Sequence, residues 1–427
     1  MRRNRAAELD LEAGQIASGA YGARVLSSRP RLLWVTYAEL TALYFVQGAA
    51  MGMWFVPLTS VLEAHGLQWL RPYAFATSAA AAFISPLFFG AMADRHLPPV
   101  VVLRRLALAT AVTMALASTA IALEAGPWVV LAAIQVHAFC TAPAWSLAAT
   151  VVFSGLRDAR NEFGPIRAVA TVGWMAGCWV VSLAAADAST LSGFAGAIAW
   201  LVVAALTFLL PGVPPPPQSG PVSLRERFGL DALALLRNRD HRVVFVTTAL
   251  FSIPLAAFYV YTPSHLQVLG LDHTASWMSL GQVTEVIAML GLARLLTRWR
   301  LKWIFGIGLL LGGVRYALCA FDTRAGLISG IFLHGASYTL VSITAQIYLD
   351  QRVDPAWKAR AQALMSLLVS GVANLVGYLG TGAWFAAQTT VGVTAWTPFW
   401  LGLAGAGTAV AVFFLATYRG RAATQNL

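Results

Sequence analysis

The chain has 427 residues, of which 58% are hydrophobic and 11% are charged, and its formal net charge is +11. An average soluble domain has about 25% charged residues, so this composition excludes an ordinary soluble globular protein. Apolar runs such as residues 103–123 and 128–153 have the length that a helix needs to cross the hydrocarbon core of a bilayer.

Two sets of apolar runs follow a polar start. Residues 1–32 carry Arg2, Arg3 and Arg5 with acidic residues after them and no apolar run typical of a signal peptide, so we expect a cytoplasmic tail. Residues 33–210 hold apolar runs near 33–62, 71–93, 101–123, 127–153, 166–186 and 190–210. Residues 243–417 hold further runs near 243–267, 274–297, 302–321, 326–349, 360–386 and 394–417. The sequence predicts an all-α membrane protein with twelve transmembrane helices in two six-helix bundles, and a second cytoplasmic tail at 418–427.

Residues 211–242 separate the two predicted bundles. The segment opens with Pro-Gly-Val-Pro-Pro-Pro-Pro, which favours a stiff, extended chain, and continues as a charged amphipathic stretch. We expect a cytoplasmic linker with an amphipathic surface helix. Alternatively, the proline run could bind a partner domain.

The basic residues support one orientation of this topology. With a cytoplasmic N-terminus, every Lys and Arg lies at or near the inner side except Arg71 and Arg324, which face outside, and Arg315, which lies within a span. This pattern follows the positive-inside rule and indicates that both termini are cytoplasmic. It accounts for the positive net charge without nucleic acid as a partner. We expect a monomer in a bacterial inner membrane, surrounded by the lipid bilayer.

Cofactor and catalytic chemistry have no support in the sequence. Cys140, Cys178 and Cys319 each fall within a predicted span and lack metal-ligand spacing, so we expect neither a metal site nor a disulfide. The spans contain no His-Glu-x-x-His or Gly-x-Ser-x-Gly motif. We therefore expect no cofactor and no enzymatic activity.

A short motif follows the second predicted span. Gly90-Ala-Met-Ala-Asp94-Arg95 resembles the Gly-x-x-x-Asp-Arg loop signature of the major facilitator superfamily. The resemblance implies that Gly90 permits a close helix approach and that Asp94, followed by Arg95, pairs with a neighbouring arginine in one conformation. The alternative is a solvated turn with incidental charges.

Two predicted spans carry polar residues on one face. Arg167, Thr171 and Trp174 lie at i, i+4 and i+7 of the fifth span, and Gln282 and Glu285 lie at i and i+3 of the eighth. Ionisable residues inside a membrane are candidates for function, so we expect both faces to line a central site. Glu285 is the candidate for proton coupling, with Arg167 tuning its proton affinity. The alternative is a buried ion pair that holds two helices together.

Other residues are candidates with a second, structural interpretation. Arg315 is a further cation that could act on Glu285. His137 is expected to be a hydrogen-bonded packing residue. Aromatic residues that could stack on a planar ligand, or serve only for packing, are Trp54, Phe55, Tyr259, Tyr261 and Tyr338.

Nearly the whole chain resembles the nucleoside:H⁺ symporter family of the major facilitator superfamily. The matching segments are Trp54-Phe-Val-Pro-Leu58, Gly164-Pro-Ile-Arg167, Thr171-Val-Gly173-Trp174, Phe228-Gly-Leu-Asp231-Ala-Leu-Ala-Leu-Leu-Arg237-Asn238, Gln282-Val-Thr-Glu285 and Arg315-Tyr316. The resemblance implies proton-driven uptake of nucleosides by alternating access. It also implies that Arg167, Thr171, Trp174, Gln282 and Glu285 line the central cavity and that Glu285 contacts the ligand.

Three segments depart from the family pattern. The seventh span has Leu255-Ala-Ala-Phe-Tyr259 in place of amide side chains, the tenth has Thr339 in place of an acid, and the fourth has Pro143-Ala144 and a later Ala149 in place of Pro-Thr and asparagine. Polar groups that bind hydroxyls discriminate strongly between substrates. A facilitator or symporter for another small polar solute, such as a sugar or an aromatic acid, therefore stays open, as does a membrane sensor without transport activity.

Overall fold

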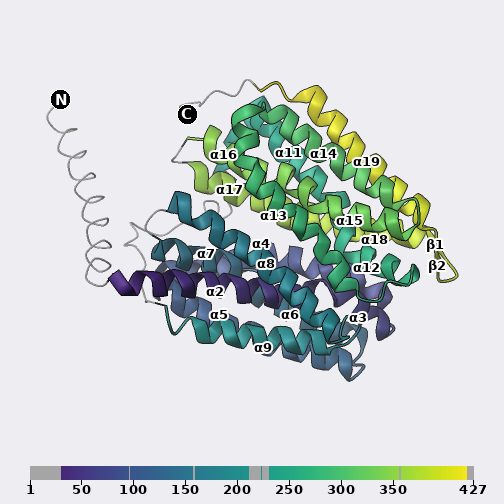
Figure 1. Cartoon of the computed structure of the whole chain (residues 1–427), viewed down its shortest axis with the longest axis horizontal. Coiled ribbons are helices and arrows are strands. Elements are labelled where there is room, and N and C mark those ends of the chain that lie inside the picture. Colours follow the sequence, from purple (N-terminus) through teal and green to yellow (C-terminus); the bar gives the residue numbers. More distant parts are fainter. Residues whose placement is uncertain are drawn as a thin grey trace.

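The computed structural model describes residues 30–95, 97–156, 159–210, 223, 230–354 and 357–420. The chain is almost entirely helical (Figure 1), and within these ranges nine helical segments are long and apolar enough to cross a membrane. Three other helices, Arg71–Arg95, Leu191–Leu206 and Thr274–Arg298, pack against them. The arrangement confirms the helical membrane fold and is consistent with twelve spans.

The N-terminal bundle forms one half of the molecule (Figure 1, purple to teal). Its helices are α2 (Pro30–Phe55), α3 (Leu58–Ala64), α4 (Arg71–Arg95), α5 (Pro99–Ala122), α6 (Pro127–Thr141), α7 (Ala144–Gly155), α8 (Ala159–Leu183) and α9 (Leu191–Leu206), with a 3₁₀ turn, η1 (Gln68–Leu70), before α4. Pro57 lies at the break between α2 and α3, and Pro143 at the break between α6 and α7. Proline lacks the N–H that would continue the helical hydrogen bonds, which explains why both spans are interrupted.

The C-terminal bundle forms the other half (Figure 1, green to yellow). Its helices are α11 (Arg239–Leu255), α12 (Ala257–Val268), α13 (Thr274–Arg298), α14 (Leu301–Cys319), α15 (Arg324–Tyr338), α16 (Thr344–Arg352), α17 (Lys358–Ser366), α18 (Asn374–Ala387) and α19 (Trp396–Thr417). The π-helical turns η3 (Thr339–Ile343) and η5 (Leu367–Ala373) join α15 to α16 and α17 to α18. Strands β1 (Thr389–Thr390) and β2 (Val393–Thr394) form a small antiparallel hairpin, the one departure from an all-α fold in the described chain.

Most of the expected linker and most of each expected tail lie outside the described residues. The described end of the linker is a 3₁₀ helix, η2 (Leu230–Arg237), whose Ala232 and Leu235 are buried in the core of the C-terminal bundle. Helix α11 begins at Arg239, before the boundary expected at 243. The Asn238 side chain accepts hydrogen bonds from the backbone N–H groups of Asp240 and His241, at 2.9 and 3.4 Å, and so caps this helix.

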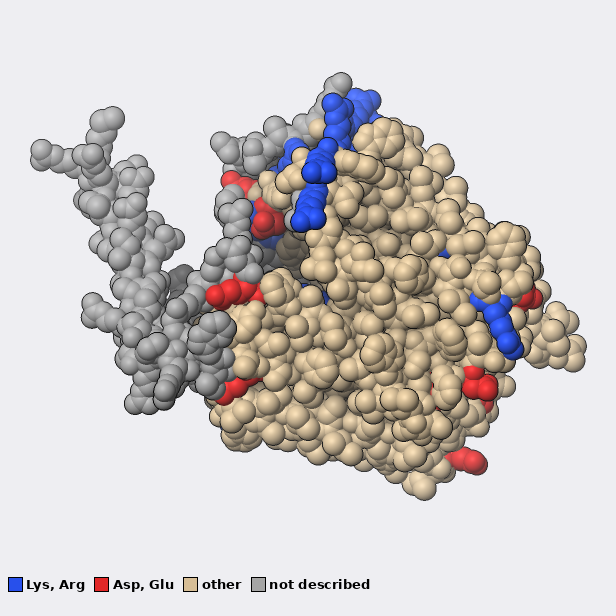
Figure 2. Space-filling model, in the orientation of Figure 1, with Lys and Arg blue, Asp and Glu red and all other residues tan. Residues whose placement is uncertain are grey.

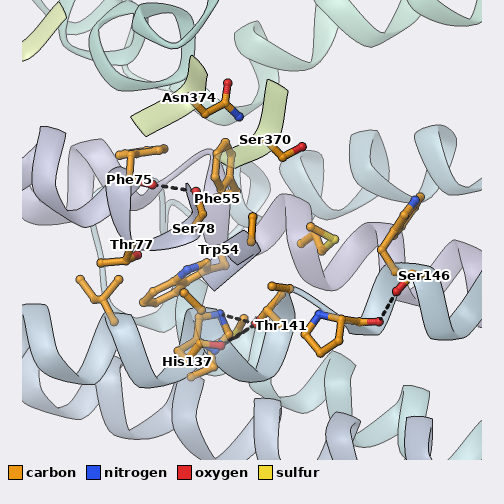
Figure 3. A pocket seen from close by; sticks show the side chains of 18 of the residues that line it. Trp54, Phe55, Phe75, Thr77, Ser78, His137, Thr141, Ser146, Ser370 and Asn374 are labelled. Atoms are coloured by element: carbon orange, nitrogen blue, oxygen red, sulfur yellow. Dashed lines mark hydrogen bonds between the residues drawn. The ribbon is translucent and has the colours of Figure 1, made fainter. Parts of the chain in front are cut away.

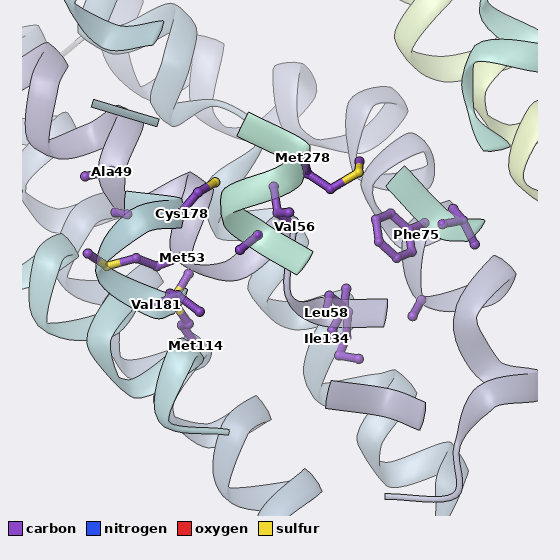
Figure 4. Close-up of a cluster of buried hydrophobic side chains, with 14 of the residues drawn as sticks. Ala49, Met53, Val56, Leu58, Phe75, Met114, Ile134, Cys178, Val181 and Met278 are labelled. Carbon is purple, nitrogen blue, oxygen red and sulfur yellow. The ribbon is translucent and has the colours of Figure 1, made fainter. Parts of the chain in front are cut away.

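Small residues allow the helices of each bundle to pack closely. An added Cβ at Gly48 would lie 2.1 Å from the Ala170 carbonyl oxygen, so α2 and α8 meet backbone to backbone. An added Cβ at Gly335 would lie 2.0 Å from the Gly281 carbonyl oxygen, so α13 and α15 meet in the same way. Around the first contact, Met53, Met114 and other apolar side chains fill the core (Figure 4).

The two bundles are joined by hydrogen bonds at one end of the molecule. Arg71 donates to Glu63 and, at 2.6 Å, to the Ser264 hydroxyl, which donates to Glu63 at 2.7 Å. Nearby, the backbone N–H of Ala275 donates to the Asp187 carboxylate at 2.7 Å. We call these five residues the clasp. It lies where α3 and α12 end, opposite the end at which α2 begins (Figure 1).

The charged residues lie mainly at the two ends of the surface shown in Figure 2. The area between these ends is almost free of Lys, Arg, Asp and Glu. Large apolar side chains such as Leu116, Ile198, Leu290 and Val412 are exposed on the helices. An exposed apolar belt with charged ends is the surface expected of a protein embedded in a bilayer.

Candidate functional site

A cavity of about 340 Å³ lies between the two bundles, and we call it the central cavity. It is lined from the N-terminal bundle by α2, α7 and α8 and from the C-terminal bundle by α11, α12, α13 and α15. All the residues predicted to bind the solute line it: Arg167, Thr171, Trp174, Tyr259, Gln282, Glu285 and Tyr338. The structure therefore brings these residues together, although they are up to 171 positions apart in the sequence.

The two polar faces meet because glycines let their helices approach their neighbours. Gly173 on α8 packs against the backbone of Phe45 on α2, where an added Cβ would lie 2.0 Å from the carbonyl oxygen. This contact fixes the side of α8 that faces the cavity, while Gly281 and Gly335 fix the positions of α13 and α15. Steric exclusion of a side chain at these positions thus sets the geometry of the site.

Opposite charges face each other across the central cavity. Glu285 on α13 is only 8% exposed, and both Arg167 and Thr171 on α8 lie close enough to interact with its carboxylate. The Arg167 guanidinium also lies over the ring of Trp145, 4.7 Å from its centroid, in a cation–π contact. A buried carboxyl group therefore stands beside a cation that belongs to the other bundle.

Two buried polar atoms of the cavity have no hydrogen-bond partner within the described ranges. The Gln282 amide nitrogen donates to the Tyr259 hydroxyl at 3.0 Å, but the Gln282 amide oxygen is unpaired, and so is the Trp174 indole nitrogen. Buried polar groups in proteins are normally paired, because leaving one unpaired costs about 1–3 kcal/mol. The lining of the site thus contains one acceptor and one donor whose hydrogen bonds are not made in this conformation.

Arg315 does not lie where it could act on Glu285, as we considered from the sequence. We considered it as a cation that could act on Glu285, but the structure places Arg167, and not Arg315, near that carboxylate. Arg315 is 1% exposed and donates hydrogen bonds to His334 and to the Tyr316 hydroxyl. His334 lines the central cavity. Sequence analysis missed His334, because no helical spacing links it to Gln282 or Glu285.

A second, larger cavity of about 770 Å³ adjoins the first, and we call it the wide cavity. Met51 and Trp145 line both cavities. The wide cavity is bounded by helices of the N-terminal bundle, including α2, α4, α6 and α7, and by α17, η5 and α18. In Figure 3, Ser370 and Asn374 lie on the wall opposite His137 and Thr141.

The remaining candidate residues lie either at the wall of the wide cavity or in the protein core. Trp54 and Phe55 line the wide cavity, whereas Tyr261 lines neither and stacks on Phe385 with a centroid distance of 4.4 Å. His137 is buried beside Trp54, and its Nε2 lies 3.1 Å from the Thr141 hydroxyl. These contacts give His137 the hydrogen-bonded packing position expected of it, at the wall of the wide cavity.

The departures from the family pattern lie at or near the two cavities. Leu255 and Tyr259 line the central cavity, so the seventh-span segment that departs from the expected pattern reaches the site. Thr339 is fully buried, and its hydroxyl lies 3.5 Å from the backbone carbonyl oxygen of Glu285. Pro143 lines the wide cavity at the break between α6 and α7.

The loop motif cannot be placed in the same detail. Helix α4 ends at Arg95, but the side chains of Asp94 and Arg95 and the surroundings of Gly90 lie outside the described part of the structure, so the role of the motif stays a prediction. Among the described residues, no three His, Cys, Asp or Glu side chains are grouped as metal ligands.

Comparison with known proteins identifies the family. Residues 35–423 match the family model described as "Nucleoside H+ symporter". The chain belongs to the nucleoside H⁺ symporter family. Membership confirms the resemblance recognised in the sequence, and it makes this symporter-family protein a membrane transporter and not an enzyme.

Relatives of this nucleoside H⁺ symporter family member match over almost their full length. The chain is 32% identical to the putative nucleoside transporter YegT of Escherichia coli, over 90% of this chain and 94% of the relative. It is 26% identical to the nucleoside permease NupG of Escherichia coli, over 89% of this chain and 95% of the relative. A crystal structure of the nucleoside transporter NupG aligns with a TM-score of 0.79 and 24% identity, covering 90% of this chain and 99% of that one. This likeness confirms the major facilitator fold.

Proposed function

We propose that this transporter takes up nucleosides together with protons by alternating access, with the nucleoside bound in the central cavity. The observation that carries the proposal is the unpaired Gln282 amide oxygen and Trp174 indole nitrogen, buried in a cavity that the two bundles share. A volume of about 340 Å³ lies at the lower end of the range of small-molecule sites, about 300–1,000 Å³. The site is thus of a size suited to one small polar solute.

The chemistry of the lining suits a molecule with a planar ring and hydroxyl groups. Trp174, Tyr259 and Tyr338 offer aromatic surfaces to a ring, as aromatic side chains do in offset or edge contacts. Glu285 and the Gln282 amide oxygen are acceptors for hydroxyl groups, and charged acceptors form the stronger hydrogen bonds. Nucleosides combine both features, and the names of the relatives YegT and NupG agree with this solute class.

Proton coupling is assigned to Glu285. Its carboxylate lies in one bundle and the Arg167 guanidinium in the other, so their attraction favours the arrangement that brings the two together. Protonation of Glu285 removes one of the two charges and weakens this attraction. Because the bundles must move relative to each other during alternating access, protonation at this position would change the balance between the two orientations.

The direction of the molecule in the membrane follows from the basic residues. With cytoplasmic termini, the clasp faces the outside of the cell, and the structure corresponds to a state closed to the outside. Arg71, one of the few basic residues expected on that side, is a member of the clasp and is buried there. We propose a monomer in the bacterial inner membrane with this orientation.

The test is uptake of labelled nucleosides into proteoliposomes under an inward proton gradient. We expect the wild-type protein to accumulate nucleoside, and Glu285→Gln to lose gradient-driven accumulation by more than tenfold because the variant cannot exchange a proton. Glu124→Gln, on an exposed loop residue, is the matched control and should accumulate normally. Undiminished accumulation by Glu285→Gln with an unchanged dependence on pH would show that Glu285 does not couple transport to protons.

A second candidate function is transport of another small polar solute. Leu255 in the central cavity and Thr339 beside Glu285 favour it, because both lie in segments that depart from the polar pattern expected of the family. Adding sugars and aromatic acids to the uptake panel decides between the two. A sugar or aromatic acid that is transported while nucleosides are not would establish the second function, and either flux would exclude a sensor without transport activity.

A further inference from the structure

A buried network lies directly behind the central cavity. Arg315 on α14 donates to His334 on α15 and, at 2.5 Å, to the Tyr316 hydroxyl, which in turn donates to the Pro254 carbonyl oxygen at 2.5 Å. Pro254 lies at the end of α11, where this span is interrupted. No carboxylate within the described ranges forms an ion pair with Arg315, so its hydrogen bonds to His334 and Tyr316 are its main polar contacts.

The hydrogen bond from Arg315 defines the state of the His334 ring. The atom that contacts the guanidinium is Nδ1 of His334. A guanidinium can only donate, so Nδ1 must accept with its lone pair, and the proton of the ring is then on Nε2. A doubly protonated ring has no lone pair and cannot accept this bond. The network therefore holds His334 as a neutral ring with an Nε2–H group.

Packing fixes the orientation of this ring. His334 stacks on Phe258 with a centroid distance of 3.8 Å and an interplanar angle of 9°. On the side of α13, an added Cβ at Gly281 would lie 3.3 Å from Cδ2 of His334, so the ring is in close contact with that helix. The ring is therefore held by a hydrogen bond from Arg315, an aromatic face and a helix backbone.

The Nε2–H group belongs to the central cavity. His334 lines this cavity with Tyr259, Glu285 and Tyr338, and Nε2 has no hydrogen-bond partner among the described residues. It is not among the buried polar atoms that lack a partner, so part of its surface is open to the cavity. It is thus accessible to a bound solute as a neutral donor.

We propose that His334 is a specificity-determining residue that donates from Nε2 to a ring nitrogen or carbonyl oxygen of the nucleobase, and that Arg315 is a positioning residue that sets its tautomer. This inference rests on the proposed transport of nucleosides. Tyr259 and Tyr338 lie beside the His334 ring, with centroid distances of 5.6 and 6.3 Å, so the donor is flanked by aromatic surfaces that suit a planar base. The ribose hydroxyls find their acceptors in Glu285 and Gln282.

The experiment compares nucleosides with analogues that lack a single acceptor. Uptake of adenosine and inosine is measured in competition with their 1-, 3- and 7-deaza analogues and with purine riboside, which lacks the 6-substituent. An analogue that lacks the acceptor leaves the buried donor of His334 without a partner, and such a loss weakens binding. We therefore expect one analogue to have a KM about tenfold higher than that of its parent nucleoside in the wild-type protein. In His334→Phe, which keeps the aromatic stack but lacks the donor, this ratio should fall to about one.

Further variants separate recognition from a purely structural role. His334→Gln offers an amide oxygen to Arg315 and an amide N–H to the ligand, and it should restore part of the ratio. Arg315→Lys keeps the charge but replaces the planar guanidinium group by a compact ammonium group. It should give a KM ratio between those of the wild type and His334→Phe. His241→Phe changes a buried histidine that bonds to Tyr348 at 2.8 Å, away from both cavities, and should leave the ratio unchanged. A structural role alone would lower transport of parent and analogue equally.

The outcomes distinguish this inference from the function on which it rests. A wild-type protein that accumulates no nucleoside would overturn the proposed function and, with it, the role of His334. A wild-type protein that transports nucleosides with equal KM for every analogue would overturn only the inference. If His334→Phe fails to fold, the same comparison is made with His334→Gln. If the ratio of the KM values of analogue and parent is the same in Arg315→Lys as in the wild type, Arg315 has no positioning role.

Discussion

The two adjoining cavities differ in how their polar groups are satisfied. In the wide cavity, Ser78 donates to the Phe75 carbonyl oxygen at 2.7 Å and Ser146 donates to the Pro143 carbonyl oxygen at 3.0 Å, so each hydroxyl is paired with a backbone carbonyl three residues earlier in the chain (Figure 3). In the central cavity, a glutamine oxygen and an indole nitrogen are buried without partners, whereas the lining of the wide cavity has one such atom, the Trp200 indole nitrogen. The smaller cavity therefore has more buried, unpaired polar atoms than the larger one, and this difference favours the central cavity as the binding site.

The charges of the two cavities differ as well. Arg167 and Glu285 both line the central cavity and come from different bundles, whereas the titratable member of the wide cavity is His137, which bonds to Thr141 within its own helix. Movement of the bundles therefore changes the electrostatics of the central cavity much more than those of the wide one. We expect substitutions in the two cavities to have unequal effects.

The largest effect is expected from Arg167→Leu. This variant leaves the buried Glu285 carboxylate without the cation that interacts with it across the cavity, and a buried charge without a compensating charge is unfavourable. We expect kcat/KM for nucleoside uptake to fall by about 100-fold or more. Arg300→Leu, on an exposed residue between α13 and α14, is the control. A fall of less than about threefold would mean that the opposite charges do not matter for the central cavity.

A smaller effect is expected from Gln282→Met. The side chains are similar in size, but methionine lacks the amide oxygen that we expect the solute to satisfy, so the solute loses one hydrogen bond. Ligand binding, measured by isothermal titration, should weaken by about tenfold. Asn374→Leu in the wide cavity is the matched comparison and should change binding by less than about twofold. If both variants lose the same affinity for the ligand, the central cavity is not the preferred binding site.

The smallest effect on affinity is expected from Ala138→Phe. Ala138 lines the wide cavity, and a phenyl group there fills part of its volume without touching Arg167 or Glu285. We expect the dissociation constant for nucleoside to change by less than about twofold, measured by the same titration. Loss of binding in this variant, with unchanged thermal stability, would place the solute in the wide cavity instead.

Much of the fold and part of the site could be predicted from the sequence for a physical reason. Hydrocarbon thickness sets the length of apolar runs, and regular helical spacing places Arg167, Thr171 and Trp174 on one face. The same spacing links Gln282 with Glu285. Because α8 and α13 are regular helices through these positions, the predicted faces meet in the central cavity.

Contacts between distant segments could not be predicted in this way. His334 and Arg315 lie on different helices, and their hydrogen bond depends on the packing of α14 against α15. The clasp joins Glu63 to Ser264 across the two bundles. The π-helical turn η3 follows Tyr338 directly, and an inserted residue changes which side chains share a face beyond it. Periodicity along one helix carries no information about any of these features.

The clasp has a consequence for how tightly solute is held from the two sides of the membrane. Solute arriving at the clasped end can bind only to the fraction of molecules in which the clasp is open. The apparent dissociation constant from that side is the intrinsic constant divided by this open fraction, so an open population of about 1% would weaken the apparent affinity about 100-fold. The strength of a few hydrogen bonds far from the central cavity thus sets the solute concentration at which the transporter half-saturates from outside, without changing a single contact to the solute.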